Sequence, residues 1–143
     1  MLLRKILDAP TSACVESLYL ELGLVPIGII IKARRVNFYH YLVNLNNEEM
    51  LFKFVEAQLR NPCKDDWTLQ ALQDFKDLGI PSNKEVLKKK SKNAFKRLVK
   101  IKTKEFALNQ LLNLKGTHSK MDNLKYSELK LQDYLKDGNL KTE

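Results

Sequence analysis

Residues 18–42 read LYLELGLVPIGIIIKARRVNFYHYL, and the break in the middle of this stretch decides the fold. Gly23 is typical of the residue that ends a helix. Pro26 suits the first turn of the next helix, where its missing N–H has no helical partner. We therefore predict a short amphipathic helix that ends at Leu22 and a long apolar helix that runs from Pro26 to about Asn44.

The rest of the chain carries further helix signals and no convincing strand. Capping-box patterns at Asn46–Glu49 and Ser82–Glu85 mark two helix starts. Helices are also expected over residues 48–60, 65–78, 91–114 and 127–135, with a short basic helix opened by Ser82. Their inward faces are expected to be Met50, Phe54 and Ala57, then Leu69, Leu72 and Phe75, then Ala94, Leu98, Ile101, Leu108 and Leu112. The sequence thus predicts an all-α fold, an irregular bundle of six or seven helices.

Composition places the chain among ordinary globular proteins. Of its 143 residues, 44% are hydrophobic and 29% are charged, which disfavours wholesale disorder. The longest uncharged apolar run, residues 22–31, is shorter than the roughly 20 residues that a membrane span needs. Because the N-terminus has no signal-peptide pattern either, we expect an intracellular protein with no membrane partner.

Charge is distributed unevenly between the two halves of the chain. Residues 1–81 contain 9 Lys/Arg and 10 Asp/Glu, whereas residues 82–143 contain 16 Lys/Arg and 7 Asp/Glu. The step in charge coincides with the break at Ile80–Ser82. We therefore predict a near-neutral helical lobe over 1–81 and a basic helical lobe over 82–143, with a frayed C-terminus after Gly138.

A run of basic residues between Lys84 and Lys104 is the strongest functional signal. It contains ten Lys/Arg and a single acid, Glu85. A solvated lysine face normally carries interspersed acids for pairing along the helix, and these are missing here. The residues that form the expected cationic ridge are Lys88, Lys89, Lys90, Lys92, Lys96, Arg97, Lys100 and Lys104. Such a ridge favours nucleic acid, with an ordinary solvated lysine face as the main alternative and a membrane surface or a calmodulin-like partner as lesser ones. Since lysine is a point charge, we expect contacts to the backbone with little sequence readout.

A smaller basic cluster lies on the long apolar helix. Arg34 and Arg35 follow Lys32 there, and the aromatic run Phe38–Tyr41 comes next. Basic and aromatic residues together are consistent with base stacking, although an aromatic run in an apolar helix is more often core. Both interpretations remain open from the sequence.

The sequence offers no metal site and no catalytic constellation. The N and S ligands, Cys14, His40, Cys63 and His118, lack the close pairs typical of zinc sites. Asp65–Asp66 opens a predicted helix, where carboxylates serve as caps. No nucleophile-elbow or phosphate-loop motif occurs. We therefore expect no metal, no cofactor and no enzyme activity in this chain.

Short sequence matches in a fixed order cover most of the chain. They comprise Arg4–Leu7, Ala9–Pro10, Glu16, residues 18–23, Pro26–Ile27, Arg34–Arg35, Tyr39, His40, Leu42, Glu49–Leu51, Lys53, Ala57–Gln58, Asp66–Trp67, Ser91–Lys92, Phe95–Lys96, Val99–Lys100 and His118–Lys120. In this order and spacing they resemble the thumb and linker region that follows the reverse transcriptase core of non-LTR (LINE-like) retrotransposon proteins.

The resemblance implies a parent protein that copies its own RNA into DNA at a nicked chromosomal target. The polymerase palm would precede Met1, and a zinc knuckle, in some lineages with a nuclease, would follow Glu143. The chain contains neither an aromatic-x-Asp-Asp nor a CCHC pattern. The resemblance therefore implies a non-catalytic piece of a longer polyprotein, with the missing parts as partners and a nuclear location.

These observations lead to one leading hypothesis and two alternatives. The leading hypothesis is that the chain binds template RNA or an RNA–DNA duplex through backbone phosphates. The contacts would come from Lys88, Lys89, Lys92, Lys96, Arg97, Lys100 and Lys104, with Arg34 and Arg35 as a second contact. The first alternative is a structural connector with no affinity for nucleic acid. The second is a stand-alone protein–protein module whose basic helix docks in an acidic groove.

Overall fold

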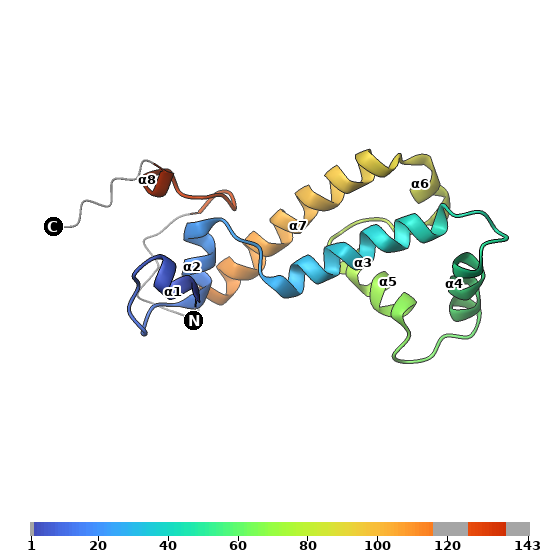
Figure 1. Cartoon of the computed structure of the whole chain (residues 1–143), viewed down its shortest axis with the longest axis horizontal. Coiled ribbons are helices and arrows are strands. Elements are labelled where there is room, and N and C mark those ends of the chain that lie inside the picture. The colour runs from blue at the N-terminus through green and yellow to red at the C-terminus, as the bar shows by residue number, and fades with distance from the viewer. Residues whose placement is uncertain (1, 116–125, 137–143) are drawn as a thin grey trace. The chain divides into compact units, whose positions relative to one another are not determined.

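The computed structural model describes residues 2–115 and 126–136, and within these ranges the chain is all-α with no strand (Figure 1). None of the described helices is long and apolar enough to cross a membrane. The helices are α1 (Leu2–Ile6), α2 (Val15–Leu22), α3 (Ile27–Val43), α4 (Met50–Arg60), α5 (Trp67–Asp77), α6 (Lys84–Lys89), α7 (Lys92–Lys115) and α8 (Asp133–Lys136).

The chain forms two compact units that differ from the predicted lobes. The first unit combines residues 1–26 with 104–143, and the second contains residues 27–103. The predicted boundary after residue 81 lies inside the second unit, because residues beyond it pack against α3 and α5. His40 stacks on Phe95 with ring centroids 4.0 Å apart, and Phe75 lies 6.3 Å from the same ring.

The helix break predicted from residues 18–42 is present. α2 ends at Leu22, and Gly23 adopts the left-handed conformation with φ of 64°. The N–H of Gly23 donates to Leu20 O and the N–H of Leu24 donates to Tyr19 O, which is a Schellman-type closure. α3 then starts at Ile27, directly after Pro26, and ends at Val43. Local chemistry alone therefore places this break correctly.

Gly23 also permits a close approach within the first unit. A Cβ at this position would lie 2.6 Å from Lys130 Cα and would overlap the Lys130–Leu131 peptide. The same segment bonds to α2 through Gln132 N–H, which donates to Glu21 O at 3.1 Å. The Tyr126 hydroxyl donates to the Glu21 carboxylate. The Gly23 turn is therefore both a helix end and a packing site.

The second unit has its core around α3. Tyr39 on this helix meets Phe75 edge-on, with ring centroids 5.4 Å apart, and both side chains are fully buried. The remaining buried apolar residues of this unit are Ile29, Val36, Leu42, Val43, Val55, Ala71, Leu78, Ile80, Leu87, Phe95 and Val99. Because this core draws residues from α3 to α7, it holds the basic α6 and the start of α7 against the long helix.

The predicted inward face of α4 was wrong. Met50 and Phe54 are 82% and 54% exposed, and Ala57 is exposed too, whereas Val55 is the buried residue. The helix begins at Met50 rather than at residue 48, and Glu49 occupies its N-cap position without a side-chain bond to the helix. The predicted Asn46–Glu49 box therefore does not cap it.

The predicted apolar face of α7 was also displaced, by about one residue. Ala94 and Ile101 are exposed, and the buried residues recur every four positions as Phe95, Val99, Thr103, Ala107 and Leu111. In α5 the prediction was correct for Phe75, while Leu69 and Leu72 are only half-buried. The predicted helix over 127–135 is reduced to α8, and the loop around His118 lies outside the described residues.

Ion pairs in the second unit make a specific contribution to acid stability. The Lys32 ammonium holds the pKa of Asp77 below its ordinary 3.8, and Lys84 holds the pKa of Glu56 below its ordinary 4.5. A lowered carboxyl pKa stabilises the fold above the unfolded value, and this stability is lost as the pH falls through the folded pKa. The fold should therefore weaken below about pH 4.

We expect the double variant Asp77→Asn, Glu56→Gln to lose less stability than the wild type between pH 6 and pH 3. The reason is that the two groups that gain protons on unfolding are gone. Urea unfolding followed by circular dichroism at both pH values measures the difference. The control is Glu48→Gln, Asp65→Asn, which removes two exposed carboxylates of the same unit. An equal loss in both double variants would show that the two ion pairs have no part in the acid response.

Candidate nucleic-acid interface

A sharp turn between α6 and α7 carries the densest part of the basic run. Asn83 caps α6, since its side-chain oxygen accepts the N–H of Glu85 at 2.9 Å, one residue later than the predicted Ser82 box. Lys90 ends α6 in an extended conformation. Ser91 then caps α7, as predicted, because its Oγ accepts the N–H of Ala94 at 3.3 Å. Two residues, Lys90 and Ser91, thus separate α6 from α7.

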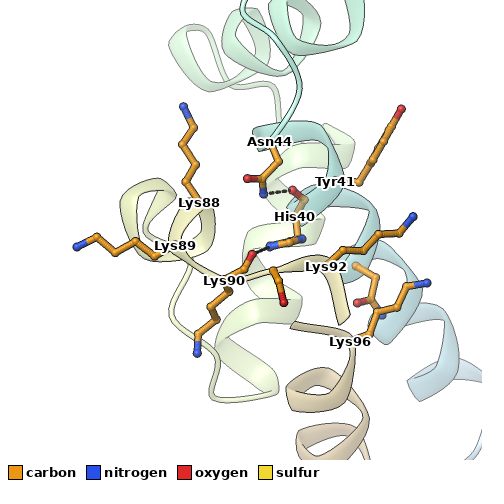
Figure 2. Close-up of a pocket in the computed structure, with 10 residues that line it drawn as sticks. His40, Tyr41, Asn44, Lys88, Lys89, Lys90, Lys92 and Lys96 are labelled. Carbon is orange, nitrogen blue, oxygen red and sulfur yellow. Dashed lines mark hydrogen bonds between the residues drawn. The ribbon is translucent and has the colours of Figure 1, made fainter. Parts of the chain in front are cut away.

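His40 fixes this turn to α3. Its ring is buried against Phe95, and its Nε2 lies 3.1 Å from Leu87 O and 3.2 Å from Lys90 O (Figure 2). Since a carbonyl oxygen only accepts, Nε2 must carry a proton and donate to the end of α6. Leu87 O also accepts the N–H of Lys90 at 3.2 Å, so the His40 ring adds a second bond at this helix end. His40 therefore positions the turn from the core and is not a surface group.

Five lysines surround a hollow of about 510 Å³ beside this turn. We call it the lysine hollow; the lysines are Lys88, Lys89, Lys90, Lys92 and Lys96. All five are exposed, and Figure 2 shows their side chains fanning outward around His40 and Asn44. No carboxylate occurs among the described residues that line the hollow. The rim of the hollow therefore carries positive charge that no acid among the described lining residues offsets.

The start of α7 adds to this positive potential. Ser91 and Lys92 line the hollow, and Lys92 opens a helix that runs to Lys115. The first amides of a helix have no carbonyl partner within it, and the helix dipole places partial positive charge there. A phosphate at this end would meet lysine charge and the helix dipole, while the N–H of Ala94 is already bonded to Ser91 Oγ. The geometry suits phosphate oxygens better than it suits a neutral ligand.

The structure separates the predicted site residues into three groups. Lys88, Lys89, Lys92 and Lys96 meet at the lysine hollow. Arg97, Lys100 and Lys104 are exposed further along α7 and do not line the hollow. Arg34 is exposed on α3. Arg35 is committed to a side-chain network, because its Nε lies 2.6 Å from Asp74 Oδ2 and its Nη2 lies 3.2 Å from Oδ1.

The commitment of Arg35 removes it from the contact set. Asp74 is only 2% exposed, and Lys32 Nζ lies 3.1 Å from the same carboxylate. A guanidinium held by a buried carboxylate cannot turn to a phosphate without giving up both of its bonds to that charge, which would leave Lys32 as the remaining cation there. The second predicted contact therefore reduces to Arg34.

A second hollow in the same unit provides a useful contrast. Lys53, Arg60 and Lys84 line it together with Glu56. Lys84 forms an ion pair with Glu56, and Lys84 and Lys88 each lie 6.0 Å from the centre of the Phe52 ring. The carboxylate offsets part of the positive charge there. The lysine hollow is thus the more favourable anion site of the two.

Several lining residues were not among the predicted contacts. Asn37 and Tyr41 come from α3 and Asn44 directly follows it, while Lys90 and Ser91 come from the turn. A sequence signal existed only for Tyr41, as part of the aromatic run, and for Lys90, as part of the basic run. The α3 residues join the lysines because His40 holds the turn beside α3, and no local pattern reports that contact.

Among the described residues, no group of three or more His, Cys, Asp or Glu side chains could hold a metal ion. Asp66 occupies the N-cap position of α5, as predicted, but its carboxylate accepts the N–H of Cys63 at 2.7 Å instead of a helix N–H. Searches for similar proteins found no matching family model, no similar curated protein and no similar solved structure.

Proposed function

We propose that this chain is a non-catalytic nucleic-acid-binding piece of a non-LTR retrotransposon reverse transcriptase. In this proposal it binds template RNA or an RNA–DNA duplex through backbone phosphates. The observation that carries the binding proposal is the lysine hollow, where five exposed lysines and the start of α7 meet and none of the described lining residues is a carboxylate. The ancestry is supported by the ordered sequence matches from Arg4 to Lys120.

The electrostatic argument favours a polyanion over a small anion. Exposed basic residues continue along α7 beyond the hollow at Arg97 and Lys100, so the positive charge is extended and not confined to one pocket. Each phosphate that a lysine neutralises releases condensed counterions, and this release drives binding to a chain of phosphates. Such binding weakens steeply with salt and depends little on sequence.

Binding should lose salt dependence when charge is removed from the lysine hollow. We expect the triple variant Lys89→Gln, Lys92→Gln, Lys96→Gln to lower the slope of log K against log salt by about 2, since each phosphate contact contributes roughly 0.7–0.9. Fluorescence anisotropy with a labelled RNA over a salt series measures this slope.

A matched control separates location from net charge. The triple variant Lys53→Gln, Lys64→Gln, Lys76→Gln removes the same charge from exposed positions of the same unit that do not line the lysine hollow. Its slope should stay close to that of the wild type. Equal slopes for the two triple variants would overturn the proposed site. Absence of RNA binding in the wild type would favour the connector alternative.

The ancestry has its own test in the genomic sequence around the coding region. We expect reading frames before Met1, even across a frameshift, to encode a polymerase palm with an aromatic-x-Asp-Asp motif. Upstream sequence with no such frame would overturn the retrotransposon origin. It would leave the lysine hollow as a binding site of different descent.

A further inference from the structure

Two aromatic rings next to the lysine hollow, those of Phe38 and Tyr41, are partly exposed to solvent and are not buried in the core. Phe38 and Tyr41 lie one helical turn apart on α3 and are 46% and 48% exposed. Their ring centroids are 5.9 Å apart with an interplanar angle of 20°. The other aromatic residue between them, Tyr39, is fully buried. The aromatic run therefore divides into a core residue and an exposed stacked pair.

Phe38 supports this pair from the protein side. Its ring meets Trp67 edge-on at 5.4 Å, and Trp67 is itself half-buried. Tyr41 stacks on Phe38, and the ring as a whole remains about half exposed. A ring held on one side by a neighbour and open on the other is already ordered for a further stacking partner. Little side-chain entropy then remains to be lost on binding.

Tyr41 belongs to the lysine hollow as well as to the aromatic pair. It lines the hollow together with Lys92 and Lys96, and Figure 2 shows all three side chains extending to the same side. An aromatic face beside lysines is the combination that binds single-stranded nucleic acid, because bases stack on the ring while phosphates meet the charges. In a duplex both faces of each internal base are already covered, so the ring has no partner there.

We infer that the lysine hollow binds single-stranded polynucleotide in preference to duplex, with Tyr41 as the ring on which a base stacks. This inference rests on the proposed function and narrows its ligand from nucleic acid in general to an unpaired strand. The volume of about 510 Å³ falls in the range of sites that enclose small groups, roughly 300–1,000 Å³. A base can enter such a hollow, whereas a duplex meets it only through its backbone.

Fluorescence anisotropy of the full chain tests the inference with four nucleic-acid probes of equal length, and those that carry bases share one sequence. These are single-stranded RNA, single-stranded DNA, an RNA–DNA duplex and an abasic single strand. We expect Tyr41→Ala to weaken binding of both unpaired strands by roughly tenfold or more. Binding of the duplex and the abasic strand should change by less than about twofold, because neither offers a free base face. Tyr41→Phe should retain wild-type affinity, since the ring is kept.

The control is Phe54→Ala, which removes another half-exposed ring of the same unit that does not line the hollow. It should leave all four affinities unchanged, and circular dichroism confirms the fold of each variant. The single-strand inference fails if Tyr41→Ala weakens binding of single strands and of the duplex equally. It also fails if the variant weakens binding of neither.

The triple variant Lys89→Gln, Lys92→Gln, Lys96→Gln distinguishes failure of the single-strand inference from failure of the proposed function. If that variant still weakens binding of every probe, the phosphate site stands without the stacking role. If it weakens none, the proposed function itself fails. Displacement of RNA by polyglutamate at equal charge concentration would overturn both and indicate an acidic protein partner.

Discussion

Replacement of Gly23 by alanine is expected to destabilise the first unit by about 3 kcal/mol or more. Two effects add at this position. The backbone is left-handed, with φ of 64°, which costs an L-residue about 1–2 kcal/mol. A Cβ would also overlap the Lys130–Leu131 peptide, and backbone cannot move aside as a flexible side chain can. Overpacking of this kind adds about 1–3 kcal/mol.

Two other glycines serve as matched controls for these two effects. Gly79 has the same φ of 64°, and a Cβ added there would meet no atom within 4 Å, so Gly79→Ala should cost only the conformational strain, about 1–2 kcal/mol. Gly28 lies in α3 with similar open space and no positive φ. Gly28→Ala should stabilise the protein by about 0.5–1 kcal/mol, because alanine is the better helix former.

Urea unfolding ranks the three variants, and amide hydrogen exchange localises the effect. In Gly23→Ala the N–H of Gln132 should lose protection, because displacement of residues 130–131 breaks its bond to Glu21 O. The Gly79→Ala variant should keep that protection. If Gly23→Ala and Gly79→Ala cost the same and Gln132 stays protected, the close approach to Lys130 contributes nothing to stability.

Local chemistry explains which parts of the fold the sequence could predict. The end of α2 at Gly23 and the start of α3 after Pro26 depend on the backbone preferences of those residues alone. The end of α5 at Asp77 is of the same kind, since Gly79, two residues later, also has positive φ. These features need no information from distant residues, and they were predicted correctly.

Helix faces failed where several apolar stripes compete. α7 has apolar residues on more than one side, and the choice between Leu98–Ile101 and Phe95–Val99 depends on what each stripe can pack against. Phe95 is selected because the His40 ring lies against it, and these residues are far apart in the sequence. In α4 the three apolar positions taken as the core side are exposed for the same reason. Periodicity predicts that a helix has a buried side but does not decide between overlapping sides.

The candidate site likewise has a part that the sequence predicts and a part that depends on contacts between distant residues. The lysine spacing from Lys88 to Lys96 is visible in the sequence, and each of these residues is exposed as expected. The part played by α3 is not visible, because it depends on His40 reaching carbonyls 47 and 50 positions away. The pairing of Arg35 with Asp74 is not visible in the local pattern either, since Asp74 lies 39 positions away.

Asp74 carries a buried negative charge in the second unit. The fold tolerates this charge only because Arg35 and Lys32 pair with it. Its carboxylate is 2% exposed and accepts from Arg35 through two nitrogens and from Lys32 through one. Both cations keep somewhat more than a quarter of their side-chain surface in solvent. Removal of the negative charge would leave the half-buried Arg35 without its carboxylate partner and Lys32 with Asp77 as its remaining one. Breaking a buried pair in this way costs about 3–5 kcal/mol, and the partial exposure of the cations places the effect near the lower value.

We therefore expect Asp74→Asn, which keeps the size of the side chain, to destabilise the second unit by about 3 kcal/mol. Asp77→Asn is the control, because Asp77 also pairs with Lys32, at 2.6 Å, but is about a quarter exposed and should cost less than about 1 kcal/mol. Urea unfolding at pH 7 measures both. The double variant Asp74→Leu, Arg35→Met should recover much of the loss, since an apolar pair leaves no unpaired charge from either residue. If the double variant is no more stable than Asp74→Asn, the loss arises from disrupted packing between α3 and α5 and not from an uncompensated charge.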